Sequence, residues 1–361
     1  MLIKSNAEDF VVEEVLDLSI QEQGDYGYFL LKKKNWTTLK ALEFLAKQLH
    51  VNVKRFAVAG QKDRKAVTTQ YVSGYQVSEQ DLRRVKLKDI RIHFVGYGDK
   101  PLALGQLRGN RFTVVARELK KPLRTLYSVV NYFDEQRFGG YRPNLPRIGK
   151  KILLGEYEDA VKLFLLYPFP EETPDYAYAR QWMEAHWGTW SMEHFPRYLL
   201  NERKIIGYLA GHPGDFQGAL KALPRQLFTM LAQAYQSYLF NESLARYLRR
   251  TFPKYVGVPY ALGTLTFVET YKDIDWPIVG YKSQLLGDQK EIIEELMREE
   301  EIWYETFHCS IPALASEGLT RKAFVKVEDF CLGQFQNKVQ EVSFFLPKGS
   351  YATIVMKALV A

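Results

Sequence analysis

The last part of this chain holds a piece of structure that cannot fold by itself. Residues 339–346 predict a strand and residues 351–359 an amphipathic helix, and Pro347-Lys-Gly-Ser350 predicts a turn and cap between them. A lone strand and helix have no partner against which to bury their apolar faces. We therefore expect this C-terminal piece to return to a sheet that is built by the first part of the chain.

Residues 1–140 mix strands and helices. Leu39, Leu42 and Leu45 recur at helical spacing, with Thr37 or Thr38 as the cap. Pro122 predicts the start of another helix, which places four apolar residues on one face, namely Leu123, Leu126, Val130 and Phe133. A short helix is predicted at 79–85, and strands are predicted at 10–16, 26–34, 55–59, 68–75, 90–97 and 111–117. Short connections between such elements are typical of an α/β sheet.

The middle of the chain has a different pattern. Gly139-Gly140, with Pro143 and Pro146, is typical of a linker. Beyond it, helices are predicted at 156–166, 176–187, 192–203 and 225–250, and an acidic helix at 289–303. We therefore predict an α/β (α+β) fold with a mixed-sheet core. Residues 1–144 and 316–361 form that core, and residues 145–315 form an inserted, mainly α-helical domain.

Composition limits the kinds of function. The 361 residues are 47% hydrophobic, enough for a substantial core, and the net charge of +7 favours a polyanionic partner. Cys309 and Cys331 are the only cysteines, which suits a reducing cytoplasm, and no apolar run is long enough to span a membrane. We find no zinc-binding motif and no Gly-Lys-Ser/Thr phosphate loop, so we expect neither a metal nor a nucleotide cofactor.

The stretch from residue 56 to residue 70 carries the strongest chemical signal. Its strand ends at Ala59-Gly60, where glycine allows a sharp turn, and Asp63 follows among three cations, Lys62, Arg64 and Lys65. The cations favour an ionised carboxylate and could hold a phosphate backbone beside it. The same residues could equally form a charged turn whose aspartate caps the next segment. This stretch alone leaves both interpretations open.

Four other segments combine polar and aromatic residues in an unusual way: Lys4 to Glu14, Leu107 to Phe112, Asn131 to Gly139 and Phe345 to Thr353. Taken singly, each is explained by a turn, a helix cap or a strand start. Taken in order, they resemble the TruD family of tRNA pseudouridine synthases. The resemblance runs through Glu8-Asp-Phe-Val-Val12, Ala59-Gly-Gln-Lys-Asp-Arg-Lys-Ala-Val-Thr68, Gly109-Asn-Arg-Phe112, Asn131-Tyr-Phe133, Gln136-Arg-Phe-Gly139 and Leu346-Pro-Lys-Gly-Ser-Tyr-Ala-Thr353.

A weaker match is Ala234-Tyr-Gln-Ser-Tyr-Leu-Phe-Asn241, and the region from about 145 to 315 matches only in patches. The resemblance implies isomerisation of uridine to pseudouridine in tRNA, with uridine-13 of the D arm as the expected target and no cofactor. It places the catalytic carboxylate at Asp63, as nucleophile or base, with Lys4 beside it. It implies that the base leaves its stack and enters a pocket lined by Phe10, Asn110, Phe112 and Tyr351, and that Phe112 stacks on it.

Six cations are candidates for contacts with the RNA backbone, namely Lys62, Arg64, Lys65, Arg108, Arg111 and Arg137. We expect a cytoplasmic monomer that binds tRNA and no membrane. The main alternative is a non-catalytic RNA-binding protein on the same fold. An enzyme for a small anionic substrate is a second alternative, which the missing phosphate loop and metal motifs disfavour.

Overall fold

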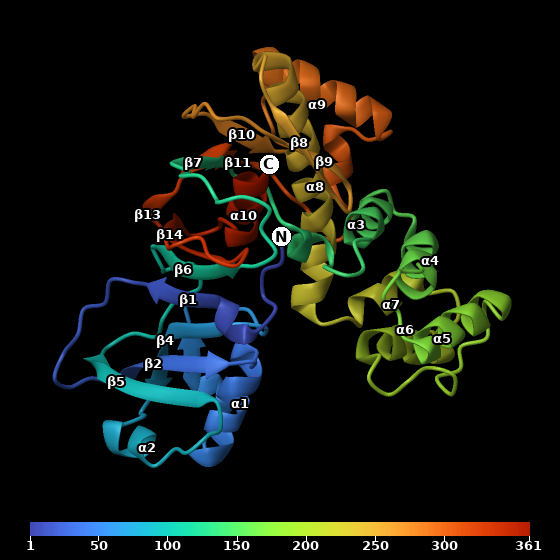
Figure 1. Ribbon diagram of the computed structural model, residues 1–361. Helices are drawn as coiled ribbons and strands as arrows, with labels where there is room; N and C mark the ends of the chain where they lie inside the picture. Colours follow the sequence, from blue (N-terminus) through green and yellow to red (C-terminus); the bar gives the residue numbers. More distant parts are fainter. The chain divides into compact units, whose positions relative to one another are not determined.

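The computed structural model describes all residues, Met1 to Ala361, and the chain divides into two compact units. Unit 1 contains Met1–Val129 and Val325–Val360, and unit 2 contains Val130–Phe324 with Ala361. The chain contains both strands and helices, and its middle is mostly helical, as the sequence predicts (Figure 1).

Unit 1 is built on an eight-stranded sheet, in which β13, β14, β6, β1, β4, β2 and β5 follow one another and β3 pairs with β4. β1 and β4 run parallel, whereas the other pairs are antiparallel, so the sheet is mixed. The strands are β1 (Phe10–Val15), β2 (Tyr26–Lys34), β3 (Phe56–Val58), β4 (Val67–Tyr75), β5 (Ile90–Gly98), β6 (Gly109–Ala116), β13 (Glu328–Leu332) and β14 (Gln340–Pro347).

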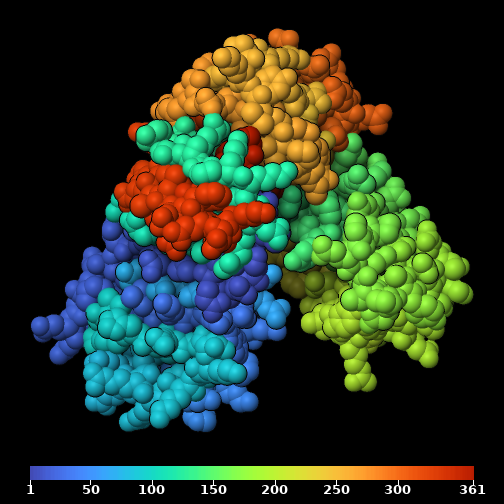
Figure 2. Space-filling view, viewed as in Figure 1, coloured from blue at the N-terminus to red at the C-terminus, as the bar shows by residue number.

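The C-terminal strand returns to this sheet, as the sequence predicts. β14 pairs with β6 along its whole length, from Gln340 opposite Ala116 to Pro347 opposite Gly109. In the space-filling view, the C-terminal residues (red) accordingly lie against the segment near residue 115 (Figure 2). The helix that follows, α10 (Ala352–Val360), buries most of its apolar side chains. Residues far apart in sequence therefore share one core.

Helix α1 (Thr38–Gln48) covers part of the sheet. Thr37 is its N-cap, because its side chain accepts a hydrogen bond from the Lys40 amide. The buried face of α1, with Leu42 and Leu45, packs in one cluster with Phe29 and Leu31 of β2. Unit 1 also contains the short helix α2 (Glu79–Arg83). The apolar residues at helical spacing in α1 and at alternate positions in β2 therefore form one apolar layer between the helix and the sheet.

Unit 2 is mostly helical. Its helices are α3 (Leu145–Leu153), α4 (Tyr157–Leu166), α5 (Pro174–Ala185), α6 (Leu200–Gly211), α7 (Phe216–Lys221), α8 (Arg225–Thr251) and α9 (Gly287–Glu299). Two antiparallel strand pairs accompany them, the hairpin of β8 (Val256–Tyr260) with β9 (Gly263–Phe267), and β10 (Asp275–Ile278) with β11 (Leu319–Lys322), which come together from either side of α9 in the sequence. The short strands β7 (Ser128–Val130) and β12 (Phe324–Lys326) pair with each other at the two points where the chain changes unit. None of the helices combines the length and apolar character needed to cross a bilayer.

Asn241 of α8 joins the polar segment Asn131 to Gly139 to the weaker family match, Ala234 to Asn241. Its side-chain amide pairs with both backbone groups of Phe133: the Phe133 amide donates to Oδ1 at 2.9 Å, and Nδ2 donates to the Phe133 carbonyl at 2.8 Å. Arg137 donates to Ser237 Oγ of the same helix at 3.0 Å. The segment Asn131 to Gly139 is thereby fixed to α8 within unit 2.

The predicted helix from Pro122 is wrong. The segment after Pro122 is irregular and leads into strand β7. Hydrogen bonds to another part of the chain fix both sides of Pro122: the Leu119 amide donates to the Lys338 carbonyl at 3.0 Å, and the Leu123 amide donates to the side-chain Oε1 of Gln340 at 2.8 Å. The apolar residues of this segment are buried, as their spacing suggests, but Leu123, Val129 and Val130 reach the core from a non-helical backbone.

The helix predicted at 192–203 is also partly wrong, because regular helix begins only at Leu200. Pro196 interrupts the segment, since proline disfavours helical geometry in the residue before it and has no amide proton to donate. By contrast, Pro146 of the predicted linker lies in the first turn of α3, where a missing amide proton does no harm.

Candidate active site

Asp63 lies in the loop that joins β3 to β4, on the sheet of unit 1. Its carboxylate Oδ2 is 2.5 Å from the Lys4 ammonium, and the Asp63 side chain keeps 30% of its exposure. The structure therefore brings together the two residues that the resemblance pairs, although they are 59 positions apart in sequence. A partly exposed carboxylate remains accessible to a ligand, whereas the carboxylate of a fully buried ion pair would not be accessible.

Lys4 reaches Asp63 from an uncommon backbone conformation. Its φ angle is +60°, in the left-handed region that side-chain-bearing residues rarely occupy. Its ammonium also lies 4.0 Å from the centre of the Phe10 ring, so the ring face and the carboxylate share one cation. Local strain of this kind persists only where surrounding contacts enforce it, and it gathers at functional sites. Nine other side-chain-bearing residues of this chain also have a positive φ, so the conformation of Lys4 gains weight from its contacts with Asp63 and Phe10.

An aromatic wall extends from Phe10 away from this pair. The rings of Phe10 and Phe112 meet edge to face with centroids 6.0 Å apart, and Phe112 lies 5.6 Å from Phe344. Phe10 is 2% and Phe112 7% exposed. Neighbouring strands β1 and β6 therefore supply the wall, and little of the Phe112 ring is open to a base in this conformation.

Asn110, at the start of β6, carries an unsatisfied buried acceptor. Its Oδ1 atom is buried and has no hydrogen-bond partner, as is also true of Ser350 Oγ. Orphaned buried acceptors are costly and uncommon in native proteins, so each calls for an explanation such as a ligand donor. Tyr351, the fourth predicted pocket residue, follows β14 at the turn into α10 and is half-buried.

The loop before Asp63 is fixed by a buried polar network that sequence reasoning missed. The Lys62 amide donates to Thr38 Oγ1 at 3.1 Å, Thr38 Oγ1 donates to Gln70 Oε1 at 2.8 Å, and Gln70 Nε2 donates to the Gly60 carbonyl at 3.0 Å. Thr38 and Gln70 are buried, at 3% and 0% exposure. The one available signal was a glutamine at an inward-facing position of strand β4.

Lys62 forms a buried ion pair with Glu14 of β1. The side chains keep 6% and 0% of their exposure, and the Glu14 carboxylate also accepts a hydrogen bond from the Tyr71 amide at 3.1 Å. An ammonium buried in this way does not reach a phosphate at the surface. The predicted RNA-backbone contact for Lys62 therefore does not fit the structure, in which this pair joins the Asp63 loop to β1.

The other predicted backbone contacts occupy varied positions. Arg64 and Lys65 are exposed in the same loop as Asp63. Arg111 pairs with Asp329 at 2.7 Å, and Arg108 lies 3.7 Å from Asp17 with 62% of its side chain exposed. Arg137 belongs to unit 2, where it is bonded to α8. Four of the six candidates therefore lie in unit 1 with exposed or half-exposed side chains.

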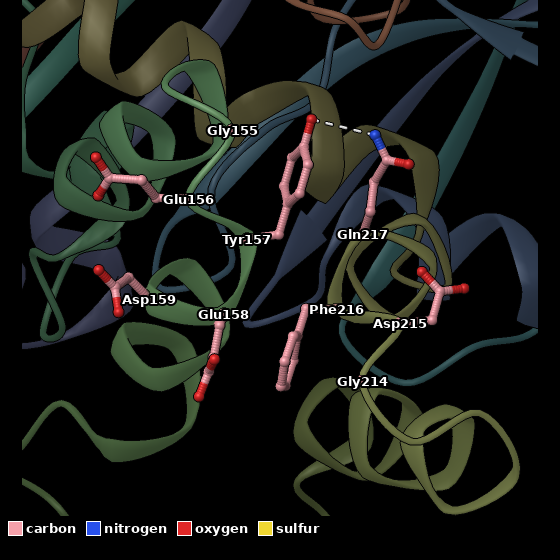
Figure 3. Close-up of a pocket in the computed structure, with 9 residues that line it drawn as sticks. All are labelled: Gly155, Glu156, Tyr157, Glu158, Asp159, Gly214, Asp215, Phe216 and Gln217. Atoms are coloured by element: carbon pink, nitrogen blue, oxygen red, sulfur yellow. Dashed lines mark hydrogen bonds between the residues drawn. The ribbon is translucent and has the colours of Figure 1, made fainter.

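Unit 2 contains a separate pocket of different chemistry. Residues 155–159 and 214–217 line a hollow of about 560 Å³, in which the Gln217 amide donates to the Tyr157 hydroxyl at 3.1 Å (Figure 3). Its four carboxylates, Glu156, Glu158, Asp159 and Asp215, would repel a phosphate. No group of three or more His, Cys, Asp or Glu residues is placed to hold a metal ion. The Asp63 loop is thus the better candidate site for an RNA substrate.

A lysine-paired aspartate on a loop of a mixed sheet, beside an aromatic wall, is an arrangement that suits an enzyme acting on a nucleobase. Comparison with known proteins specifies the family. The family model described as tRNA pseudouridine synthase D (TruD) matches residues 1–257 and 269–359. The chain belongs to this TruD family, which confirms the resemblance, the mixed α/β fold class and the enzyme class predicted from the sequence.

Individual relatives cover nearly the whole chain. The chain is 34% identical to a "Probable tRNA pseudouridine synthase D" of Methanopyrus kandleri, over 94% of this chain and 86% of the relative. It is 32% identical to the tRNA pseudouridine synthase D of Aquifex aeolicus, over 99% and 97%. Among solved structures, the crystal structure described as the "Putative tRNA pseudouridine synthase D (TruD)" of Methanosarcina mazei superposes with a TM-score of 0.76, at 28% identity, over 99% of this chain and 93% of that chain.

Proposed function

We propose that this chain isomerises uridine to pseudouridine in tRNA, at uridine-13 of the D arm, with Asp63 as the catalytic carboxylate. Family membership over the whole chain supports the reaction class. The observation that carries the residue assignment is the Asp63–Lys4 pair, which holds a partly exposed carboxylate 2.5 Å from an ammonium. The ammonium donates a hydrogen bond to the carboxylate and holds it in place, where it can act as a nucleophile or as a base toward the sugar.

The surrounding residues suit a flipped uracil. Uracil presents two carbonyl acceptors and one N3–H donor on its polar edge. The unpartnered Oδ1 of Asn110 can accept a hydrogen bond from that N3–H group. Phe10 and Phe112 supply an apolar surface for the ring, with a small movement needed to open the face of Phe112. Tyr351 completes the proposed pocket, and Arg64, Lys65, Arg108 and Arg111 are the proposed backbone contacts from unit 1.

The unit boundaries support an assignment of domains. We infer that unit 1 is the catalytic core and that the mainly helical unit 2 is the inserted domain, which contributes Arg137. The proposal includes a cytoplasmic monomer that works on tRNA without a cofactor or metal. A non-catalytic RNA-binding protein remains the alternative outcome of the experiment below.

The test is pseudouridine mapping on unmodified tRNA transcripts incubated with the wild type, Asp63→Asn and a matched control. Asp25→Asn makes the same chemical change at an exposed aspartate of unit 1 and should leave activity intact. We expect pseudouridine at position 13 with the wild type and the control. Asp63→Asn should lose about 10⁴-fold or more in rate, as loss of a reacting group does, while its tRNA affinity stays within a few-fold.

Product formation by Asp63→Asn at the wild-type rate would refute the assignment of Asp63. Tight, salt-sensitive tRNA binding by the wild type without any pseudouridine would instead favour the non-catalytic alternative. Pseudouridine at another position would refute the proposed target and keep the enzyme class.

A further inference from the structure

Lys33 of β2 is a buried lysine with an unusual set of partners. It is 1% exposed and lies on the same face of β2 as Phe29 and Leu31, which are fully buried in an apolar cluster. Its ammonium donates to three backbone carbonyls, those of Trp36 at 2.7 Å, Asp63 at 2.9 Å and Lys62 at 3.4 Å. No carboxylate lies within ion-pair distance of it. An apolar residue would continue the strand pattern, so the buried charge calls for an explanation.

The carbonyl contacts place Lys33 directly behind the candidate catalytic residue. The carbonyl carbon of Asp63 is bonded to the Cα atom that carries its side chain. A donor that fixes this carbonyl therefore fixes the point from which the carboxylate extends. Lys4 holds the far end of the same residue through Oδ2, so that two lysines constrain Asp63 from its two ends.

Resting on the assignment of Asp63 proposed above, we infer that Lys33 is a positioning residue for the isomerisation. Its buried ammonium ties the backbone of Asp63 to the turn at Trp36 and so sets where the carboxylate meets the substrate. Thr38 and Gln70 tether Gly60 and the amide of Lys62, whereas Lys33 donates to the backbone carbonyl of Asp63 itself.

The surroundings of Lys33 make its charged form less favourable than in water. Burial lowers the pKa of Lys33 to about 8, the negative charge of Asp63 opposes this shift, and the positive charge of Lys62 adds to it. A lysine that served only to fill space would be replaced with gain by an apolar side chain, because the buried ammonium disfavours folding at neutral pH. Its hydrogen bonds to the Asp63 loop are the compensating interaction that the structure shows.

The experiment compares Lys33→Met with Lys32→Met. Methionine keeps an unbranched chain of similar length and removes the donor. Lys32 is the next residue on β2 and faces the opposite, exposed side, so its substitution removes a surface charge of the same kind. For both variants we would measure the single-turnover rate of pseudouridine formation with saturating enzyme, the tRNA dissociation constant and the free energy of unfolding in urea.

We expect Lys33→Met to lose about 100-fold in single-turnover rate, the scale of effect that a shift of about 1 Å in a reacting group produces. Its tRNA affinity should stay within threefold, because the ammonium is buried and cannot contact a phosphate, and its free energy of unfolding should not fall. Lys33→Arg, which keeps a cation with several donors, should recover at least part of the lost rate. Lys32→Met should keep the wild-type rate at saturation.

A folded Lys33→Met variant with a rate within threefold of wild type would overturn the inference. It would leave the proposed function standing, which depends separately on the loss of activity in Asp63→Asn. Lys33→Gln provides a second uncharged variant that is one atom shorter and keeps a polar end, and the same rate criterion applies to it. If neither variant folds, Lys33 serves folding rather than the placement of Asp63, and the inference fails as well.

Discussion

The buried Glu14–Lys62 pair allows a quantitative test of how the Asp63 loop is anchored. We would compare Lys62→Met, Glu14→Gln and the double variant with the wild type. Lys62→Met removes the cation and leaves the Glu14 carboxylate, which has no exposed surface, without its counter-ion. Glu14→Gln keeps an oxygen that can accept from the Tyr71 amide, so it removes the charge and not the hydrogen bond.

The expected magnitudes follow from the burial of both side chains. Removing one member of a buried ion pair typically destabilises a protein by about 3–5 kcal/mol, because an uncompensated charge stays in the interior. Replacing both members with uncharged side chains is much less harmful. We therefore expect about 3–4 kcal/mol for each single variant, about 1–2 kcal/mol for the double variant, and a coupling energy well above 2 kcal/mol.

Hydrogen exchange read by mass spectrometry is the suitable assay, because it reports the opening free energy of β1 and β4 separately from unit 2. Arg83→Met at the exposed Arg83–Glu79 pair of α2 is the matched control, with side chains 74% and 43% exposed. That control should change stability by under about 1 kcal/mol. Additive effects of the two single variants, or a Lys62→Met effect no larger than the control, would show that the pair does not anchor the loop.

Two further predictions concern the edges of the same site. The hydrogen bonds from Arg117 hold the pKa of Asp9 below its usual value, so this pair stabilises the fold above about pH 4 and the contribution is lost as the pH falls through the lowered pKa. Asp9→Asn should thus lower the free energy of unfolding by about 1–2 kcal/mol at pH 7 and by little near pH 2, in urea titrations at the two pH values. Gly109→Ala should destabilise unit 1 by about 2–3 kcal/mol and reduce activity, because its Cβ would collide with the Leu346 carbonyl beside Asn110. Gly211→Ala, where a Cβ meets open space, should be neutral in the same thermal and activity measurements, and equal effects at the two glycines would contradict the reasoning.

Most strands of unit 1 could be predicted from sequence, because their periodicity and their burial agree. β2 and β4 alternate between the two faces of the sheet, and Leu42 and Leu45 of α1 lie on its buried face, whereas Leu39 at the start of the helix is exposed. The return of the C-terminal strand followed from a simple physical requirement, since β14 needed a partner and found it in β6. The helix predicted after Pro122 was wrong because the hydrogen-bond partners of this region, Lys338 and Gln340, are more than 200 residues away in sequence.

The candidate site was predictable in part for a related reason. Asp63 and Lys4 stood out because charged residues around a glycine turn, and the order of several segments, resemble a known family. Lys33 gave no such signal. It is the middle residue of Lys32-Lys33-Lys34, which follows the strand-like pair Leu30-Leu31. A run of lysines at a strand end is typical of a solvated edge. Only the fold shows that the middle lysine turns inward to meet the carbonyl of Asp63.

The anchoring of the Asp63 loop also explains why its tethers come from four different elements. Glu14 lies on β1, Lys33 on β2, Thr38 on α1 and Gln70 on β4, and all four side chains are buried. A loop held by one element could move with that element, whereas a loop held by four keeps its position only when the sheet and α1 are assembled together. A carboxylate that must meet one atom of a flipped base benefits from this arrangement, since small errors in position reduce the rate steeply. Because one ion pair and several separate hydrogen bonds take part, loss of any one tether should loosen Asp63 without unfolding the chain. Lys33→Met, expected to keep its stability, and Lys62→Met, expected to lose about 3–4 kcal/mol, are the two variants in which the effects on rate and on stability can be separated.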